Sequence, residues 1–138
     1  MDPKLKTPRF NQGNHPINGL TYHYDQQQDI HWLIAAARND DQLWLIDSQG
    51  QQETKIIAVD YFAAPSSAAQ TCQPEGTMYT SGIEGVAAHG EVLWLINDPW
   101  KEMYTRNIQC PEDELTYQAF VPLLFSLPMP KIFSYKGP

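Results

Sequence analysis

Three oxygen-bearing side chains of this sequence could meet at one end of a short β-hairpin. Residues 83–98 have the pattern of two strands joined by a tight turn at Gly90, since glycine tolerates the positive φ that hairpin turns need. Antiparallel pairing would bring Glu84, at the start of the first strand, close to Asn97 and Asp98 at the end of the second. Calcium, magnesium and manganese prefer carboxylate and amide oxygens. The pattern therefore predicts a divalent-cation site formed by Glu84, Asn97 and Asp98 at this end of the hairpin, which we call the rim.

A cation at this rim could polarise a phosphoryl or ester oxygen and activate water for hydrolysis. A full calcium shell takes about six to eight oxygens, so further ligands would have to come from water, from Asn18 or from another part of the fold. We expect Asn18, His23 and Trp100 to contribute to substrate binding. The alternative is that Asp98 and the proline after it only begin a turn, and that Glu84 is a solvated strand end.

Other chemistry has less support in the sequence. It contains no Gly-x-Ser-x-Gly elbow, phosphate loop, dinucleotide fingerprint or metalloprotease helix motif. We expect His31 to lie on a strand face and His89 in a solvated turn. Cys72 and Cys110 both lie in loop-like sequence, where either a disulfide or two free thiols would fit. A zinc site is not expected, because neither cysteine has a second ligand at the usual spacing.

Length and charge bound the class of protein. A chain of 138 residues with 42% hydrophobic and 12% aromatic residues is typical of one folded domain. The net charge of −7, with only 9 Lys and Arg residues, argues against a nucleic-acid partner, since binding phosphates needs a basic surface. No run of 18 apolar residues occurs, so no membrane span is expected. Residues 1–16 lack the apolar core of a signal peptide. The mature form of an exported protein would lack it too, so export stays open.

Alternating apolar residues and polar turns predict an all-β, antiparallel architecture. The first four expected strands are 17–24, 30–37, 42–47 and 54–62. Four strands joined by short turns describe a meander, the unit of a β-propeller blade. We expect a polar lead-in and a single propeller-like domain over 17–138. The expected divisions are the lead-in 1–16, a blade over 17–62, a loop over 63–80, a second blade over 81–127 and a tail over 128–138.

The second half is less regular after its first two strands. Residues 100–111 could hold a short strand or a helical turn. The acidic residues after Pro111 are typical of the first turn of a helix. Residues 119–127 have the pattern of a closing strand, with Pro122 at an edge or a bulge.

A weak internal repeat relates the two expected blades. The matched segments are 17–20 with 83–86, and 32–34 with 94–96. In this alignment Asn18 corresponds to Glu84, and Ala35 and Ala36 correspond to Asn97 and Asp98. The two expected blades share their apolar residues at the aligned positions, but their polar residues differ. The acidic and amide residues are therefore expected to serve something local to the second blade.

Residues 17–22, 82–87 and 93–99 resemble the repeats of the phytase-like propeller proteins, the "esterase-like activity of phytase" family. More distantly they resemble gluconolactonase-type propellers, which place Glu, Asn and Asp on a central metal. The resemblance covers about residues 17–130. It implies that Glu84, Asn97 and Asp98 lie at the central-channel end of a blade, and it implies an exported, periplasmic bacterial protein.

The chain departs from that family in having about two blades, where closed propellers have about four to eight. It could be the C-terminal part of a longer propeller, its copies could assemble as a homo-oligomer to close a ring, or it could adopt another small β fold. The function expected first is binding of a divalent cation and a small-molecule ligand, with possible hydrolysis of a phosphate or carboxylic ester. The alternative is a non-catalytic binding or assembly module.

Overall fold

The first four strands form a continuous antiparallel meander. The computed structural model describes residues 17–38, 41–59, 61, 78, 81–108, 110–111, 114–117 and 121–134. The strands are β1 (Ile17–Asp25), β2 (Ile30–Ala37), β3 (Gln42–Asp47) and β4 (Lys55–Ala58), and their order in the sheet is β1-β2-β3-β4. The predicted meander is therefore confirmed, with β4 shorter than expected. The lead-in 1–16 and most of the loop 63–80 lie outside the described residues.

The second sheet has three described strands, where a four-stranded blade was expected. Its strands are β5 (Ile83–His89), β6 (Val92–Asn97) and β7 (Leu124–Pro128), in the order β5-β6-β7. The chain between β6 and β7 contains helices instead of a strand in its described part: α2 (Lys101–Arg106) and α3 (Glu114–Tyr117). The tail contributes α4 (Met129–Ser134). Two antiparallel sheets thus make the described fold mostly β, and the four-stranded form of the second unit is not observed.

The pairing register shows that the internal repeat extends to a structural irregularity. Each hairpin has a register shift at the same place, between Ile17 and Gly19 in β1 and between Ile83 and Gly85 in β5. Asn18 is therefore the extra residue of a β-bulge in the first hairpin, and the residue after Ile83 has the same role in the second.

The register also corrects the alignment of the second strands of the two hairpins. Ile17 pairs with Ala37, and Ile83 pairs with Asn97. Asn97 therefore corresponds to Ala37 and Asp98 to Arg38, two residues beyond the alanines that the tryptophan match indicated. The tryptophan match fails because Trp94 occupies the position of Ile34 and the second hairpin is shorter around its turn.

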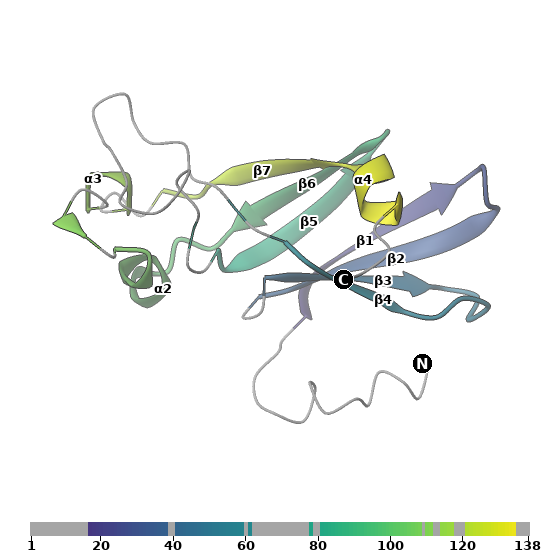
Figure 1. Cartoon of the computed structure of the whole chain (residues 1–138), viewed down its shortest axis with the longest axis horizontal. Helices are drawn as coiled ribbons and strands as arrows, with labels where there is room; N and C mark the ends of the chain where they lie inside the picture. The colour runs from purple at the N-terminus through teal and green to yellow at the C-terminus, as the bar shows by residue number, and fades with distance from the viewer. Residues whose placement is uncertain are drawn as a thin grey trace.

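The first strands of the two hairpins lie side by side in Figure 1 and run in the same direction. A Cβ atom on Gly19 would lie 2.9 Å from the carbonyl oxygen of Glu84 and 3.1 Å from the amide nitrogen of Val86. Further along, the amide of Ala88 donates a hydrogen bond of 3.1 Å to Oγ1 of Thr21. Glycine is needed at position 19 because the β5 backbone leaves no room for a side chain there.

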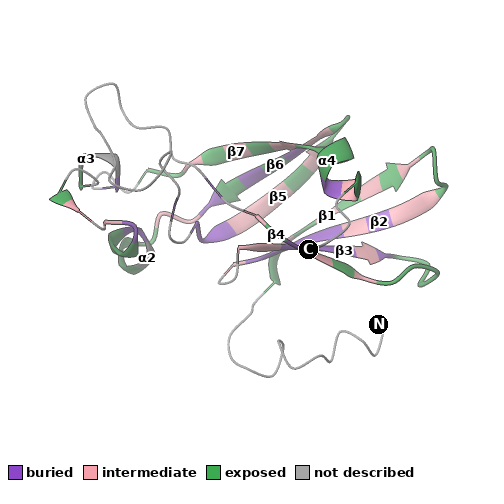
Figure 2. Cartoon of the chain, in the orientation of Figure 1, coloured by how far each residue is buried: buried purple, intermediate pink, exposed green. Residues whose placement is uncertain are grey.

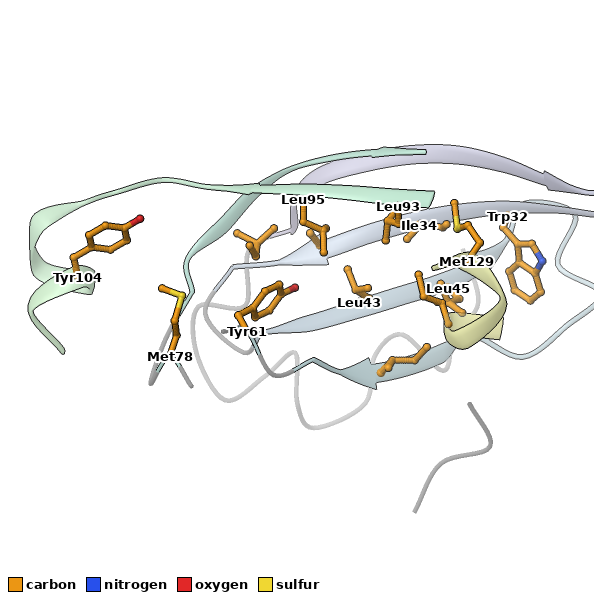
Figure 3. Packing of buried hydrophobic residues seen from close by; sticks show 14 of the residues in the cluster. Trp32, Ile34, Leu43, Leu45, Tyr61, Met78, Leu93, Leu95, Tyr104 and Met129 are labelled. Atoms are coloured by element: carbon orange, nitrogen blue, oxygen red, sulfur yellow. The ribbon is translucent and has the colours of Figure 1, made fainter. Parts of the chain in front are cut away.

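The main hydrophobic core lies between the two sheets, as Figure 3 shows. The first sheet contributes Trp32, Ile34, Leu43 and Leu45, and the second contributes Leu93 and Leu95, all at most 2% exposed. Figure 2 shows buried residues on β3 and along the second half of β2. On its other face, Ala35 and Ala37 pack with Trp44 in a smaller cluster.

Helix α4 covers the core at the end where the hairpin turns lie. Its first amide, on Met129, donates a hydrogen bond of 2.8 Å to the carbonyl oxygen of Glu91 in the β5–β6 turn. The ring of Phe133 lies 5.4 Å from the ring of His23 and 5.5 Å from the ring of Trp32. Helix α4 therefore contacts both sheets.

The carboxylate of Asp47 organises the turn after β3. It accepts hydrogen bonds from the backbone amides of Gln49, Gln51 and Gln52 at 2.8–2.9 Å. These bonds, the one from Gln49 above all, hold the pKa of Asp47 below its ordinary value of 3.8. The folded state therefore binds a proton less readily than the unfolded state, and the stabilisation is complete above the ordinary pKa and lost as the pH falls below it.

We expect the Asp47→Asn variant to have a lower melting temperature than the wild type at neutral pH. The three bonds use both carboxylate oxygens, and an amide keeps only one acceptor oxygen, so the variant cannot retain all of them. The gap between variant and wild type should narrow as the pH falls through the acidic range. Thermal unfolding followed by circular dichroism at several pH values measures both effects, and a gap independent of pH would contradict this account.

Candidate functional site

The two carboxylates that the sequence placed at one rim do lie close together, and an arginine joins them. Nη1 of Arg38 lies 2.7 Å from Oε1 of Glu84, and Nη2 lies 3.0 Å from Oδ2 of Asp98. Arg38 directly follows β2, Glu84 is the bulge residue of β5 and Asp98 directly follows β6. The ion pairs therefore link the first sheet to the second.

The predicted binding residues Asn18 and Trp100 lie beside these ion pairs. Nδ2 of Asn18 donates a weak hydrogen bond of 3.4 Å to Oε1 of Glu84. The guanidinium carbon of Arg38 lies 5.4 Å from the centre of the Trp100 ring, within the range of a cation–π contact. Trp100 remains 52% exposed, so its ring is accessible at the surface.

The side chain of Asn97 is buried and bonded to the protein itself. Its Nδ2 donates hydrogen bonds to the carbonyl oxygen of Ser81 at 3.0 Å and to the hydroxyl oxygen of Tyr104 at 2.8 Å. Its Oδ1 accepts a bond of 2.7 Å from the amide of Leu123. Only 3% of Asn97 is exposed. In this arrangement its oxygen ties β6 to the segment before β7 and is not available to a ligand at the rim.

The hydroxyl of Tyr104, on α2, completes this buried network by donating a hydrogen bond of 2.7 Å to the carbonyl oxygen of Val121. Burial raises the pKa of Tyr104 above its ordinary value, and the negative charge of Asp98 acts in the same direction. The hydroxyl therefore stays protonated and remains a donor throughout the physiological range. The network around Asn97 has the properties of a structural element.

His23 lies at the opposite end of the hairpins from the ion pairs. It lines an open cleft of about 580 Å³ between the β1–β2 turn, the β5–β6 turn and α4. Its ring stacks on Phe133. The structure therefore does not bring His23 together with Glu84 and Asp98, and the three predicted binding residues do not form one site.

The rim has the donor atoms for a hard cation, but Arg38 stands where the cation would be placed. Glu84 and Asp98 each direct one oxygen at the guanidinium. Within the residues that the structure describes, no group of three or more His, Cys, Asp or Glu side chains could hold a metal ion. A cation would have to displace the guanidinium and would find two carboxylates, since Asn97 is engaged elsewhere.

The sequence reasoning missed Arg38, the residue that organises the rim. The tryptophan-based alignment placed alanines opposite Asn97 and Asp98, which hid the correspondence of Arg38 with Asp98. The correspondence follows from the pairing register, in which Ile17 lies opposite Ala37 and Ile83 lies opposite Asn97. An arginine and an aspartate at equivalent ends of two repeats are then a visible signal for an ion pair between them.

Two further expectations concern the cysteines and the membrane. Cys110 is disulfide-bonded, while Cys72 lies outside the described residues. No helix in the described part of the chain has the length and hydropathy needed to cross a membrane.

Comparison with known proteins gave no match: no family model, no curated protein and no solved structure matched this chain. The resemblance to phytase-like propellers therefore stays a prediction, and the geometry of the described residues is the basis for a functional proposal.

Proposed function

We propose that this chain is a non-catalytic binding or assembly module built from propeller-like blades. The observation that carries this proposal is the Arg38 guanidinium between Glu84 and Asp98. Its single positive charge offsets half of the negative charge with which the two carboxylates would attract a cation. The contacts of Arg38 with both carboxylates and with the Trp100 ring make it a link between sheets.

An exposed apolar surface supports the binding role. On the outer face of the second sheet, Ile96 pairs directly with Leu124, and Trp94 lies two residues before Ile96 on β6. These side chains are 40–63% exposed. Adjacent large apolar groups on one exposed sheet face are typical of protein contact surfaces, where tryptophan is enriched among the residues that dominate the binding energy.

A second candidate function is binding of a divalent cation such as Ca²⁺, Mg²⁺ or Mn²⁺ by Glu84 and Asp98, with possible hydrolysis of a phosphate or carboxylic ester. It is favoured by the convergence of two carboxylates, from different strands, on one guanidinium at 2.7 and 3.0 Å. In this case the guanidinium of Arg38 would move aside when the cation binds.

Thermal unfolding in the presence and absence of Ca²⁺ or Mn²⁺ separates the two candidates. The proposed module should show no cation-dependent change in melting temperature, because a bound cation would cost two ion pairs. It should also leave generic phosphate and acyl esters intact. A cation-dependent rise in melting temperature, abolished by Glu84→Ala together with Asp98→Ala, would contradict the proposal and support the second candidate. The Glu102→Ala variant is the matched control, because this acidic residue lies on the exposed surface of α2.

A further inference from the structure

The two hairpins of the repeat bury opposite faces. We call the face that contains Gly19 or Gly85 the glycine face of its sheet. In the first sheet the glycine face is buried, and it contains Ile34, Ala36, Leu43 and Leu45. In the second sheet the opposite face is buried, and it contains Val86, Leu93, Leu95, Phe125 and Leu127. The core between the sheets is therefore a contact between two non-equivalent surfaces of one repeated unit.

Each sheet consequently leaves exposed the kind of face that its neighbour buries. The exposed glycine face of the second sheet carries Trp94, Ile96 and Leu124, which occupy the positions of Ile34, Ala36 and Leu43 in the first sheet. The exposed part of the first sheet's opposite face is on β1, where Leu20 and Tyr22 occupy the positions of Val86 and Ala88. The β3 part of that face, around Trp44, is buried.

Resting on the proposed assembly role, we infer that the exposed glycine face of the second sheet binds the exposed β1 face of the first sheet in a second copy of this chain. Over β1, the contact would repeat between molecules part of the packing that the two sheets already make within one molecule. Such an interface is heterologous, head to tail, and closes into a ring when the rotation per copy permits. Two, three or four copies would supply the roughly four to eight blades of a closed propeller.

The glycines of the two hairpins differ in what lies over them. Because Gly19 has no side chain, the β5 backbone can lie where the side chain of residue 19 would otherwise be. Gly85 holds the equivalent position in β5, on the exposed face. The three atoms nearest to a Cβ placed on Gly85 all belong to Ile96 of the neighbouring strand. The Cγ2 atom of Ile96 would lie 2.5 Å from that Cβ, so the side chain of Ile96 covers Gly85 and the first strand of another copy would pack on Ile96.

The complementary surface on β1 is held in a fixed arrangement. The hydroxyl of Tyr22 lies 2.5 Å from Nδ1 of His31, and the hydroxyl of Tyr24 donates a bond of 2.8 Å to Oδ1 of Asp29. The ring of Tyr24 stacks on that of His31 at 4.6 Å. With their polar ends bonded inside the chain, the tyrosine rings can be covered by a partner at little loss of hydrogen bonding.

The test uses two variants of the full chain that each disable one face. We expect wild-type protein to self-associate with increasing concentration in sedimentation velocity. Trp94→Lys on the glycine face and Tyr22→Lys on β1 should each weaken self-association about 30-fold or more, the size of effect typical of aromatic anchor residues. Val121→Lys, an exposed apolar residue outside the strands, is the matched control and should associate as the wild type does. Circular dichroism verifies that each variant is folded.

Mixing the two variants distinguishes head-to-tail from symmetric contact. Each variant keeps one intact face, so an equimolar mixture should form a heterodimer with one contact and no larger species. A mixture that remains monomeric would overturn the inference, as would a Tyr22→Lys variant that associates like the wild type. A wild-type protein that stays monomeric at every concentration also overturns it. That result would leave the cation experiment, which tests the proposed function, unaffected.

Discussion

Replacing Asn97 with alanine is expected to lower the free energy of unfolding by about 2–4 kcal/mol, because it removes three hydrogen bonds from a buried site. The amide of Leu123 and the hydroxyl of Tyr104 would lose their bonds to Asn97, and the carbonyl of Ser81 would lose its donor. Through these three groups Asn97 connects β6 with the segment before β5, with α2 and with the segment before β7. Urea unfolding followed by tryptophan fluorescence measures the change.

The matched control for this variant is Asn18→Ala, which removes the exposed asparagine at the first bulge. Its hydrogen bond to Glu84, 3.4 Å long, is at the surface, so the expected loss is under about 0.5 kcal/mol. Equal losses for the two variants would show that the buried bonds of Asn97 contribute no more to stability than a surface contact does.

Replacing Arg38 with methionine is expected to lower the free energy of unfolding by about 1–2 kcal/mol, since two ion pairs and a cation–π contact are lost. Methionine retains the apolar stem, so the change reports mainly on the charge. Arg38 is only 19% exposed, but Glu84 and Asp98 are 36% and 40% exposed, so water screens the repulsion that remains between them. This screening keeps the expected loss well below that of a fully buried pair.

Lys101→Met tests whether any loss of positive charge has the same effect on this acidic chain. Lys101 is an exposed residue at the start of α2, and no ion pair involves it in the described structure. Its replacement should change the free energy of unfolding by less than about 0.5 kcal/mol. High salt should reduce the difference between wild type and Arg38→Met, because the Debye length falls to about 3 Å at 1 M. A difference insensitive to salt would contradict an electrostatic origin.

The strands were predictable where local patterns are strong. The first three strands begin where expected, and short polar turns specify antiparallel neighbours. The second sheet was harder to predict, because the conformation of the chain after β6 depends on tertiary contacts. The hydroxyl of Tyr104 reaches Asn97 and Val121 from α2. Of the short strand and the helical turn that the sequence left open for residues 100–111, the structure contains the helix.

The candidate site was predictable only in part, for a reason of register. Hairpin pairing was enough to place Glu84 near Asp98, and the structure joins the two through Arg38. Asn97 points inward because it continues the alternation of Leu93 and Leu95 along β6. The bulge at position 84 shifts the pairing by one residue, so that Ile83 and not Glu84 lies opposite Asn97. No pattern in the sequence alone locates that shift before the pairing is known.

The position of α4 has a consequence for how the chain folds during synthesis. The first sheet is complete by Ala58 and pairs only neighbours in sequence, so it can form early. Its Trp32 is covered by Phe133, about a hundred residues further along the chain. Until α4 leaves the ribosome, the nascent protein therefore exposes apolar surface that chaperones recognise. Truncation before Phe133 would extend that exposure indefinitely.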